Sequence, residues 1–184
     1  MTAVDERYDE LWTSLHVLRE AWLEFRLAVS DHPRDADNAL VTRIEEDVDD
    51  GVAAVDEALA SLASGVGAER ADGRALAVAH EHVARARDCY WRGAGSGERR
   101  MALLSLARRH GGEWAAWVPQ VDLAGSRVPD ALAPAEDALR RTWLQLVESA
   151  SSGTISVSAT SIGQQIKVTR RRPDRRLEED GKHG

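Results

Sequence analysis

The feature that most constrains the fold is an unbroken stripe of large apolar residues near the start of the chain. These residues recur at alternating spacings of three and four, which places them on one face of an α-helix. The stripe consists of Tyr8, Leu11, Leu15, Leu18, Trp22, Phe25 and Val29. Pro33 ends this helix, because the residue before a proline is displaced from the α-helical region. An amphipathic helix of this kind predicts packing against other helices around a common core.

Apolar residues at the same spacing continue along most of the chain. Further helices are expected over residues 37–64, over residues 69–91, from about residue 98 with a break at Gly111–Gly112, and from Pro129 or Pro134 to Ser149. In the fourth region the apolar face is expected at Met101, Leu104 and Leu106. Pro119 is expected to bend the second piece of this region or to start a new turn. The expected fold is therefore all-α, an antiparallel four- or five-helix bundle over residues 1–150.

The periodicity changes from helical to strand-like after the last expected helix. Residues 154–159 and 165–169 alternate apolar and polar side chains, with a turn sequence around Gly163 between them. Because an isolated two-stranded ribbon is only marginally stable in water, residues 151–169 are expected to pair with a partner sheet or with a second copy of the chain. A disordered spacer, or a segment lying on the bundle, is the alternative. The residues expected to contact the partner are Ile155, Val157, Ala159, Ile166 and Val168.

Residues 170–184 are expected to form a flexible charged tail. The formal net charge of the chain is −7, whereas residues 167–184 carry seven basic and four acidic side chains, so the preceding body carries −10. An acidic body repels phosphate backbones, so nucleic-acid binding is expected, if at all, only through the arginines of the tail. These are Arg170, Arg171, Arg172, Arg175 and Arg176. If they bind no nucleic acid, these arginines are expected either to solubilise the chain or to dock on the acidic second helix. The acidic residues of that helix, Asp47 among them, are expected on its solvated face.

Six tryptophans against a single phenylalanine is a high count. Trp22 and Trp143 lie on apolar helix faces and are expected in the core. Trp91 lies at a helix end, and Trp114 and Trp117 lie beside residues that break helices. Core packing is one interpretation of these three side chains. The other is an exposed patch, which would mark a protein interface because tryptophan is enriched at binding hot spots.

No catalytic, cofactor-binding or metal-binding residues are predicted. Ferritin-like di-iron bundles repeat the motif Glu-x-x-His, and no histidine of this chain has a glutamate three residues before it. His80 and His82 point about 200° apart on a helix, so they cannot share one ion. Residues 93–97 are rich in glycine but lack the Gly-Lys-Ser or Gly-Lys-Thr ending of a phosphate-binding P-loop. Cys89 has no evident base beside it.

The sequence therefore predicts a non-enzymatic adaptor or accessory subunit that binds a protein partner, or itself, through its C-terminal strand-forming segment and exposed tryptophans. A cytoplasmic location is expected, since the chain has no apolar run of about 18 residues, no secretory signal and a single cysteine. The alternative is a small-molecule- or metal-binding bundle, enzymatic or not. Its ligand would lie near an internal cavity beside His16, Glu20, His80 and Cys89.

Overall fold

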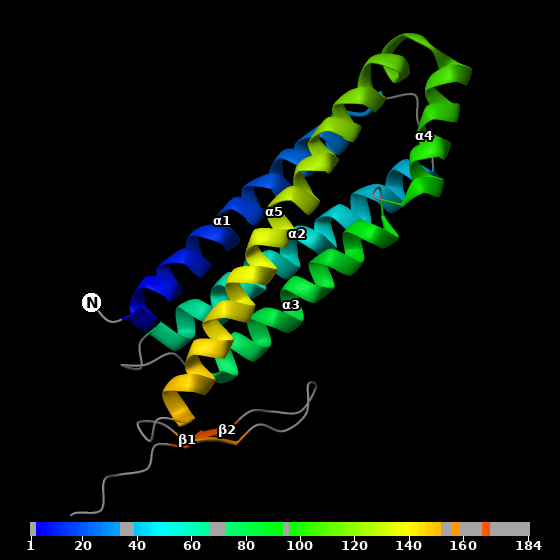
Figure 1. Cartoon of the computed structure of the whole chain (residues 1–184). Coiled ribbons are helices and arrows are strands. Elements are labelled where there is room, and N and C mark those ends of the chain that lie inside the picture. Colours follow the sequence, from blue (N-terminus) through cyan, green and yellow to red (C-terminus); the bar gives the residue numbers. More distant parts are fainter. Residues whose placement is uncertain are drawn as a thin grey trace, which may run out of the picture.

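A computed structural model describes residues 3–33, 39–66, 73–93, 96–151, 156–158 and 167–169. Within these residues, five helices pack as a bundle and two short strands pair with each other (Figure 1). The elements are α1 (Ala3–Ser30), α2 (Ala39–Val66), α3 (Gly73–Arg92), α4 (Gly97–His110), α5 (Gly112–Ser151), β1 (Ser156–Ser158) and β2 (Lys167–Thr169). The prediction of an all-α helical bundle is confirmed.

Four of the helices, α1, α2, α3 and α5, pack in a ring around the core. α1 and α3 each pack against both α2 and α5, and α4 packs against α5. Figure 1 shows α4 at one end of the bundle, beside the first turns of α5. The chain reverses between these two helices at Gly111 and Gly112, whose φ angles are 65° and 47°, a region that glycine adopts without steric cost. The break predicted at these glycines is therefore a true helix boundary.

Two contacts at opposite ends show that α1 and α5 run antiparallel. Near the start of α5, the indole Nε1 of Trp117 donates to the carbonyl oxygen of Ala28, 2.7 Å away, near the end of α1. Near the end of α5, Arg141 pairs with Glu10 of α1 at 2.8 Å. The same pair of helices therefore positions side chains from both halves of the chain.

The core is built from the apolar stripe of the first helix and the matching faces of its neighbours. Leu11, Leu15 and Leu18 are fully buried, and Trp22 and Phe25 are each 1% exposed. Complete burial of a large apolar side chain contributes about 1.5–3 kcal/mol relative to exposure. The predicted stripe is thus confirmed as the centre of the fold.

The apolar face predicted for the fourth region is wrong at one position. Met101 is 61% exposed, whereas Leu103 is 1% exposed and Leu104 is partly buried against the core. α4 packs mainly against one helix, α5. Since residues two apart on a helix point in nearly opposite directions, burial of Leu103 leaves Met101 facing solvent.

The separate helices predicted around the prolines are one continuous helix. α5 extends over 40 residues and contains Pro119, Pro129 and Pro134. An interior proline costs about 3 kcal/mol or more, because it removes a backbone hydrogen bond and crowds the preceding turn. Here the apolar face of α5, including Val128 and Leu132, is buried on both sides of these positions. Burial along the helix outweighs the local preference to break, so the predicted division is wrong.

β1 and β2 form a two-stranded antiparallel ladder after α5. Val157 is the Cα partner of Val168, and Ser156 is that of Thr169. None of the helices in the described ranges combines the length and the apolar character needed to cross a bilayer.

Candidate functional site

The residues predicted to contact a partner through strands fall only in part within the described chain. Val157 and Val168 lie opposite each other in the β1–β2 ladder. Ile155, Ala159 and Ile166 lie outside the described residues. The same is true of the five tail arginines, at positions 170, 171, 172, 175 and 176.

The exposed patch of three tryptophans is corrected by the structure. Trp91 is 52% exposed, but Trp114 and Trp117 are only 7% and 3% exposed. The rings of Trp114 and Trp117 meet edge to face at 5.6 Å, and Trp117 also lies edge-on to His32. Trp117 therefore lies on the end of α1, where its indole donates to Ala28, and Trp114 packs against Trp117. Trp91 alone of the three is a surface side chain.

A different pair of apolar side chains is exposed, one on α1 and one on α5. Leu27 is 71% exposed and Leu123 is 63% exposed. Glu24, one turn before Leu27, forms an ion pair with Arg127, one turn after Leu123. Because the two helices are antiparallel, both leucines lie on the same side of this ion pair along the helix axes. We name Leu27 and Leu123 the leucine pair.

Sequence reasoning missed the leucine pair because both residues lie off the buried stripes. Four further large apolar side chains are exposed in the described chain, at Val17, Trp91, Met101 and Leu144. The sequence could have indicated these two leucines only as apolar residues at positions where the helical period predicts polar ones. Such residues occur singly on many surfaces, so these two are informative only because they lie at similar heights on neighbouring helices.

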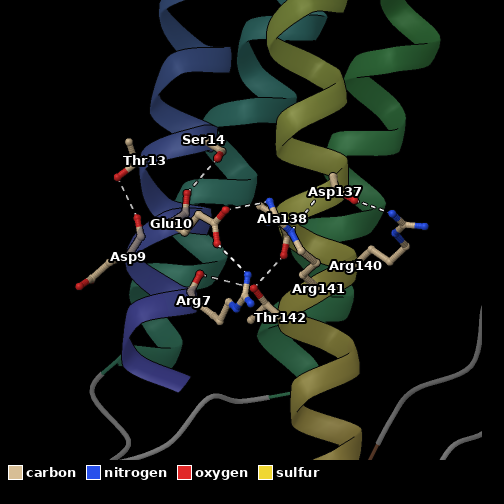
Figure 2. Close-up of polar contacts among 10 residues, drawn as sticks. All are labelled: Arg7, Asp9, Glu10, Thr13, Ser14, Asp137, Ala138, Arg140, Arg141 and Thr142. Atoms are coloured by element: carbon tan, nitrogen blue, oxygen red, sulfur yellow. Dashed lines mark hydrogen bonds and ion pairs between the residues drawn. The ribbon is translucent and has the colours of Figure 1, made fainter. Parts of the chain in front are cut away.

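A polar network joins the start of α1 to the end of α5, which lie side by side (Figure 2). Glu10 pairs with Arg7 at 3.2 Å and with Arg141 at 2.8 Å, and Arg141 also pairs with Asp137 at 3.1 Å. The hydrogen bond from Arg140 and the charge of Arg141 lower the pKa of Asp137, although slight burial opposes them. These side chains are about 40% exposed, so screening by water limits what each pair contributes. The network orients the two helices and does not resemble a catalytic dyad.

A shallow groove of about 480 Å³ lies beside this network. It is lined by Arg7, Glu10 and Arg141, together with Leu144 and three neighbouring polar residues, Glu6, Gln145 and Glu148. Its lining carries both signs of charge and is more polar than apolar. These properties do not single out one class of ligand.

Asp47 departs from the solvated position predicted for it. It is 9% exposed, and its carboxylate accepts from Arg92 at 3.1 Å and from Arg99. The hydrogen bond to Asp47 raises the pKa of the Arg92 guanidinium. A Cβ atom at Gly93 would lie 3.0 Å from the Asp47 side chain, so Gly93, directly after α3, lies against this side chain. Asp47 therefore joins α2 to the end of α3 and the start of α4.

The residues of the ligand- or metal-binding alternative are not brought together. His16 is exposed beside Trp12, with ring centroids 5.1 Å apart, and His80 is exposed on α3. Cys89 is buried, and burial raises the pKa of its thiol. Across the described ranges, no three His, Cys, Asp or Glu side chains lie close enough to hold a metal ion.

A small cavity lies where α1, α3, α4 and α5 meet, with a volume of about 160 Å³. Its apolar walls include Phe25, Tyr90 and Leu103, and its polar lining includes Arg100 and Asp122. Arg100 and Asp122 form an ion pair at 3.1 Å. No sequence motif marked this site, because its charged residues lie on different helices. Comparisons of the chain with family models, curated proteins and solved structures found no match.

Proposed function

We propose that the protein is a non-enzymatic adaptor or accessory subunit of the cytoplasm, which binds a protein partner or a second copy of itself. The observation that carries this proposal is the exposure of the leucine pair on a bundle whose core is built from other side chains. Covering one such side chain removes apolar area from water and contributes about 1.5–3 kcal/mol. Two leucines beside an ion pair have the composition of an apolar contact with a polar rim.

The second half of the proposal concerns the C-terminal segment. A ladder of only two strands has two edges, and backbone groups at an edge can pair with a strand of another chain. Such pairing supplies main-chain hydrogen bonds, while alternate side chains provide specificity. Residues 154–169 act as the docking strand in this proposal, and the arginines that follow add salt-dependent attraction to an acidic surface of the partner.

Affinity capture from native cytosol tests the proposal with three forms of the protein. These are the full chain, a chain ending at Ser151, and the full chain with Leu27→Ser and Leu123→Ser. Val17→Ser is the matched control, because Val17 is 55% exposed on α1 but does not belong to the leucine pair. Each recovered protein is then purified and mixed with the bait to measure stoichiometry and affinity.

A stoichiometric partner that needs both the leucine pair and the C-terminal segment supports the whole proposal. Dependence on only one of them restricts the contact to that surface. Light scattering of the purified chain separates a homodimer from a complex with another protein. Recovery of no partner, with a monomeric full-length chain, overturns the adaptor function.

A second candidate function is small-molecule binding by the bundle. The cavity between α1, α3, α4 and α5 favours it, since this cavity combines aromatic walls with a charged mouth.

A further inference from the structure

The cavity has the size of a single ring. Its volume is about 160 Å³, and an apolar cavity of about 150 Å³ in another protein is large enough to bind benzene. Gly125 lies in the lining and packs closely on Phe25, since a Cβ atom there would lie 3.1 Å from the Phe25 ring. The geometry therefore limits a ligand to a compact apolar body of a few heavy atoms.

Two aromatic rings form part of the wall. Phe25 of α1 and Tyr90 of α3 meet edge to face, with ring centroids 6.4 Å apart. Both are almost completely buried, at 1% and 8% exposure, so their positions are determined by core packing. Aromatic faces attract cations through the negative charge of the ring face, and the attraction strengthens where water is excluded.

The polar lining supplies a free acceptor. Arg100 Nε donates to Oδ2 of Asp122, and within the described chain no hydrogen bond is formed by the other oxygen, Oδ1. Asp122 is 27% exposed and Arg100 is 64% exposed, so the carboxylate lies deeper than the guanidinium. A donor inside the cavity therefore has a carboxylate within the lining, beside an arginine side chain that is more exposed than the aspartate.

The electrostatic field inside the cavity favours positive charge. Burial raises the pKa of Tyr90, and the negative charges of Asp122 and Asp130 raise it further, against the weaker opposing influence of Arg100. Two carboxylates thus outweigh one guanidinium at the Tyr90 hydroxyl. The formal charge of −7 on the whole chain adds long-range attraction for a cation.

We propose that this cavity binds a small organic cation, a primary ammonium carried by a compact apolar body such as one ring. The apolar body lies between Phe25, Tyr90 and Leu103, and the ammonium donates to Asp122. The site is independent of the leucine pair and of the C-terminal segment. Its failure therefore leaves the adaptor proposal intact, and the reverse is also true.

Calorimetric titration of the full-length protein with three probes of similar size tests the proposal. Benzylammonium is expected to bind more tightly than benzyl alcohol, which lacks the charge, and than benzoate, which reverses it. Backbone and methyl NMR shifts on adding benzylammonium are expected to centre on Phe25, Tyr90, Leu103 and Val121, which line the cavity.

Two variants that remove the same ion pair give the decisive comparison. Asp122→Asn removes the negative charge of the acceptor and is expected to weaken benzylammonium binding about tenfold or more, because the hydrogen bond is no longer charge-assisted. Arg100→Gln also breaks the pair but leaves the carboxylate, and is expected to retain or strengthen binding. Circular dichroism and thermal unfolding establish that both variants are folded.

Four results would overturn the proposal. The first is equal or tighter binding of benzoate or benzyl alcohol, and the second is equal loss of benzylammonium binding in both variants. The third is binding of none of the three probes by the wild-type protein. The fourth is a set of NMR shifts centred away from the cavity, a readout that does not depend on either variant folding.

Discussion

Gly51 lies where α2 packs against the Trp22 ring, and a side chain at this position has no room. A Cβ atom built there would overlap the six-membered part of the indole, which belongs to a side chain only 1% exposed. Alanine is favoured over glycine inside a helix by about 0.5–1 kcal/mol. Overpacking of a filled core costs about 1–3 kcal/mol, so the steric effect wins.

Gly51→Ala is accordingly expected to lower the free energy of unfolding by about 1–2 kcal/mol. It should also shift the tryptophan fluorescence, because the Trp22 ring must move. Urea titration measures the first effect and emission spectra the second. Gly97→Ala is the control, since no atom lies within 4 Å of a Cβ built at that position. Equal effects of the two substitutions would show that packing against Trp22 is not the cause.

Tyr90 carries a prediction about pH. Burial, followed by the charges of Asp122 and Asp130, raises the pKa of its hydroxyl above the ordinary value of 10.0. Above pH 10 the unfolded chain loses this proton before the folded chain does, so the folded state binds more protons and stability falls as pH rises. Denaturation at pH 8 to 11 should show this fall, and Tyr90→Phe should reduce it. A fall of unchanged size in Tyr90→Phe would assign the effect to other groups.

At the scale of the elements, Asp47 makes the joint between α2, α3 and α4. Asp47→Asn removes the charge that Arg92 and Arg99 share at a position 9% exposed. Hydrogen bonds to charged groups contribute about 1.5–3 kcal/mol, so a loss of about 2 kcal/mol in unfolding free energy is expected. Asp50→Asn is the control, because Asp50 is 69% exposed and lies 3.9 Å from Arg92. Similar losses in both variants would mean that Asp47 acts only as a surface charge.

The continuity of α5 through its prolines leads to a second prediction at this scale. Pro134 is exposed, and alanine there would restore a backbone donor to the carbonyl of Asp130. Proline is about 3 kcal/mol less favourable than alanine inside a helix, and it loses less backbone freedom on folding. Pro134→Ala is therefore expected to raise the thermal midpoint by several degrees. An unchanged or lower midpoint would show that α5 requires a proline here.

At the scale of the whole molecule, the described core lies entirely within the five helices. Its buried members run from Leu11 to Leu146. A chain ending at Ser151 is therefore expected to keep the helical content and the thermal midpoint of the full chain within a few degrees. Circular dichroism measures both. Loss of cooperative unfolding in the shortened chain would show that later residues complete the core.

The two proposed surfaces are separable for the same reason. The leucine pair lies on the outside of α1 and α5, whereas the cation site lies between helices at their inner faces. Substitutions at one surface leave the packing of the other unchanged. A partner and a small ligand can therefore be assayed independently on one folded scaffold.

The sequence by itself determined the helical class and the buried face of α1. Period and amphipathicity are local properties, so the stripe from Leu11 to Val29 could be read without knowledge of its neighbours. The break at Gly111 and Gly112 was equally local, because few residues other than glycine adopt those backbone angles. These features need no information about distant parts of the chain.

Only the tertiary structure decided which side chains meet. It buried Trp114 and Trp117, carried α5 through three prolines, and enclosed Asp47 between two arginines. Each outcome depends on which helix covers a given face, and that depends on contacts between residues far apart in sequence. Arg100 and Asp122, for example, approach each other only because α4 folds back on α5. The free energy of burial along whole helices outweighed the local preferences that had predicted exposed tryptophans and a break at the prolines.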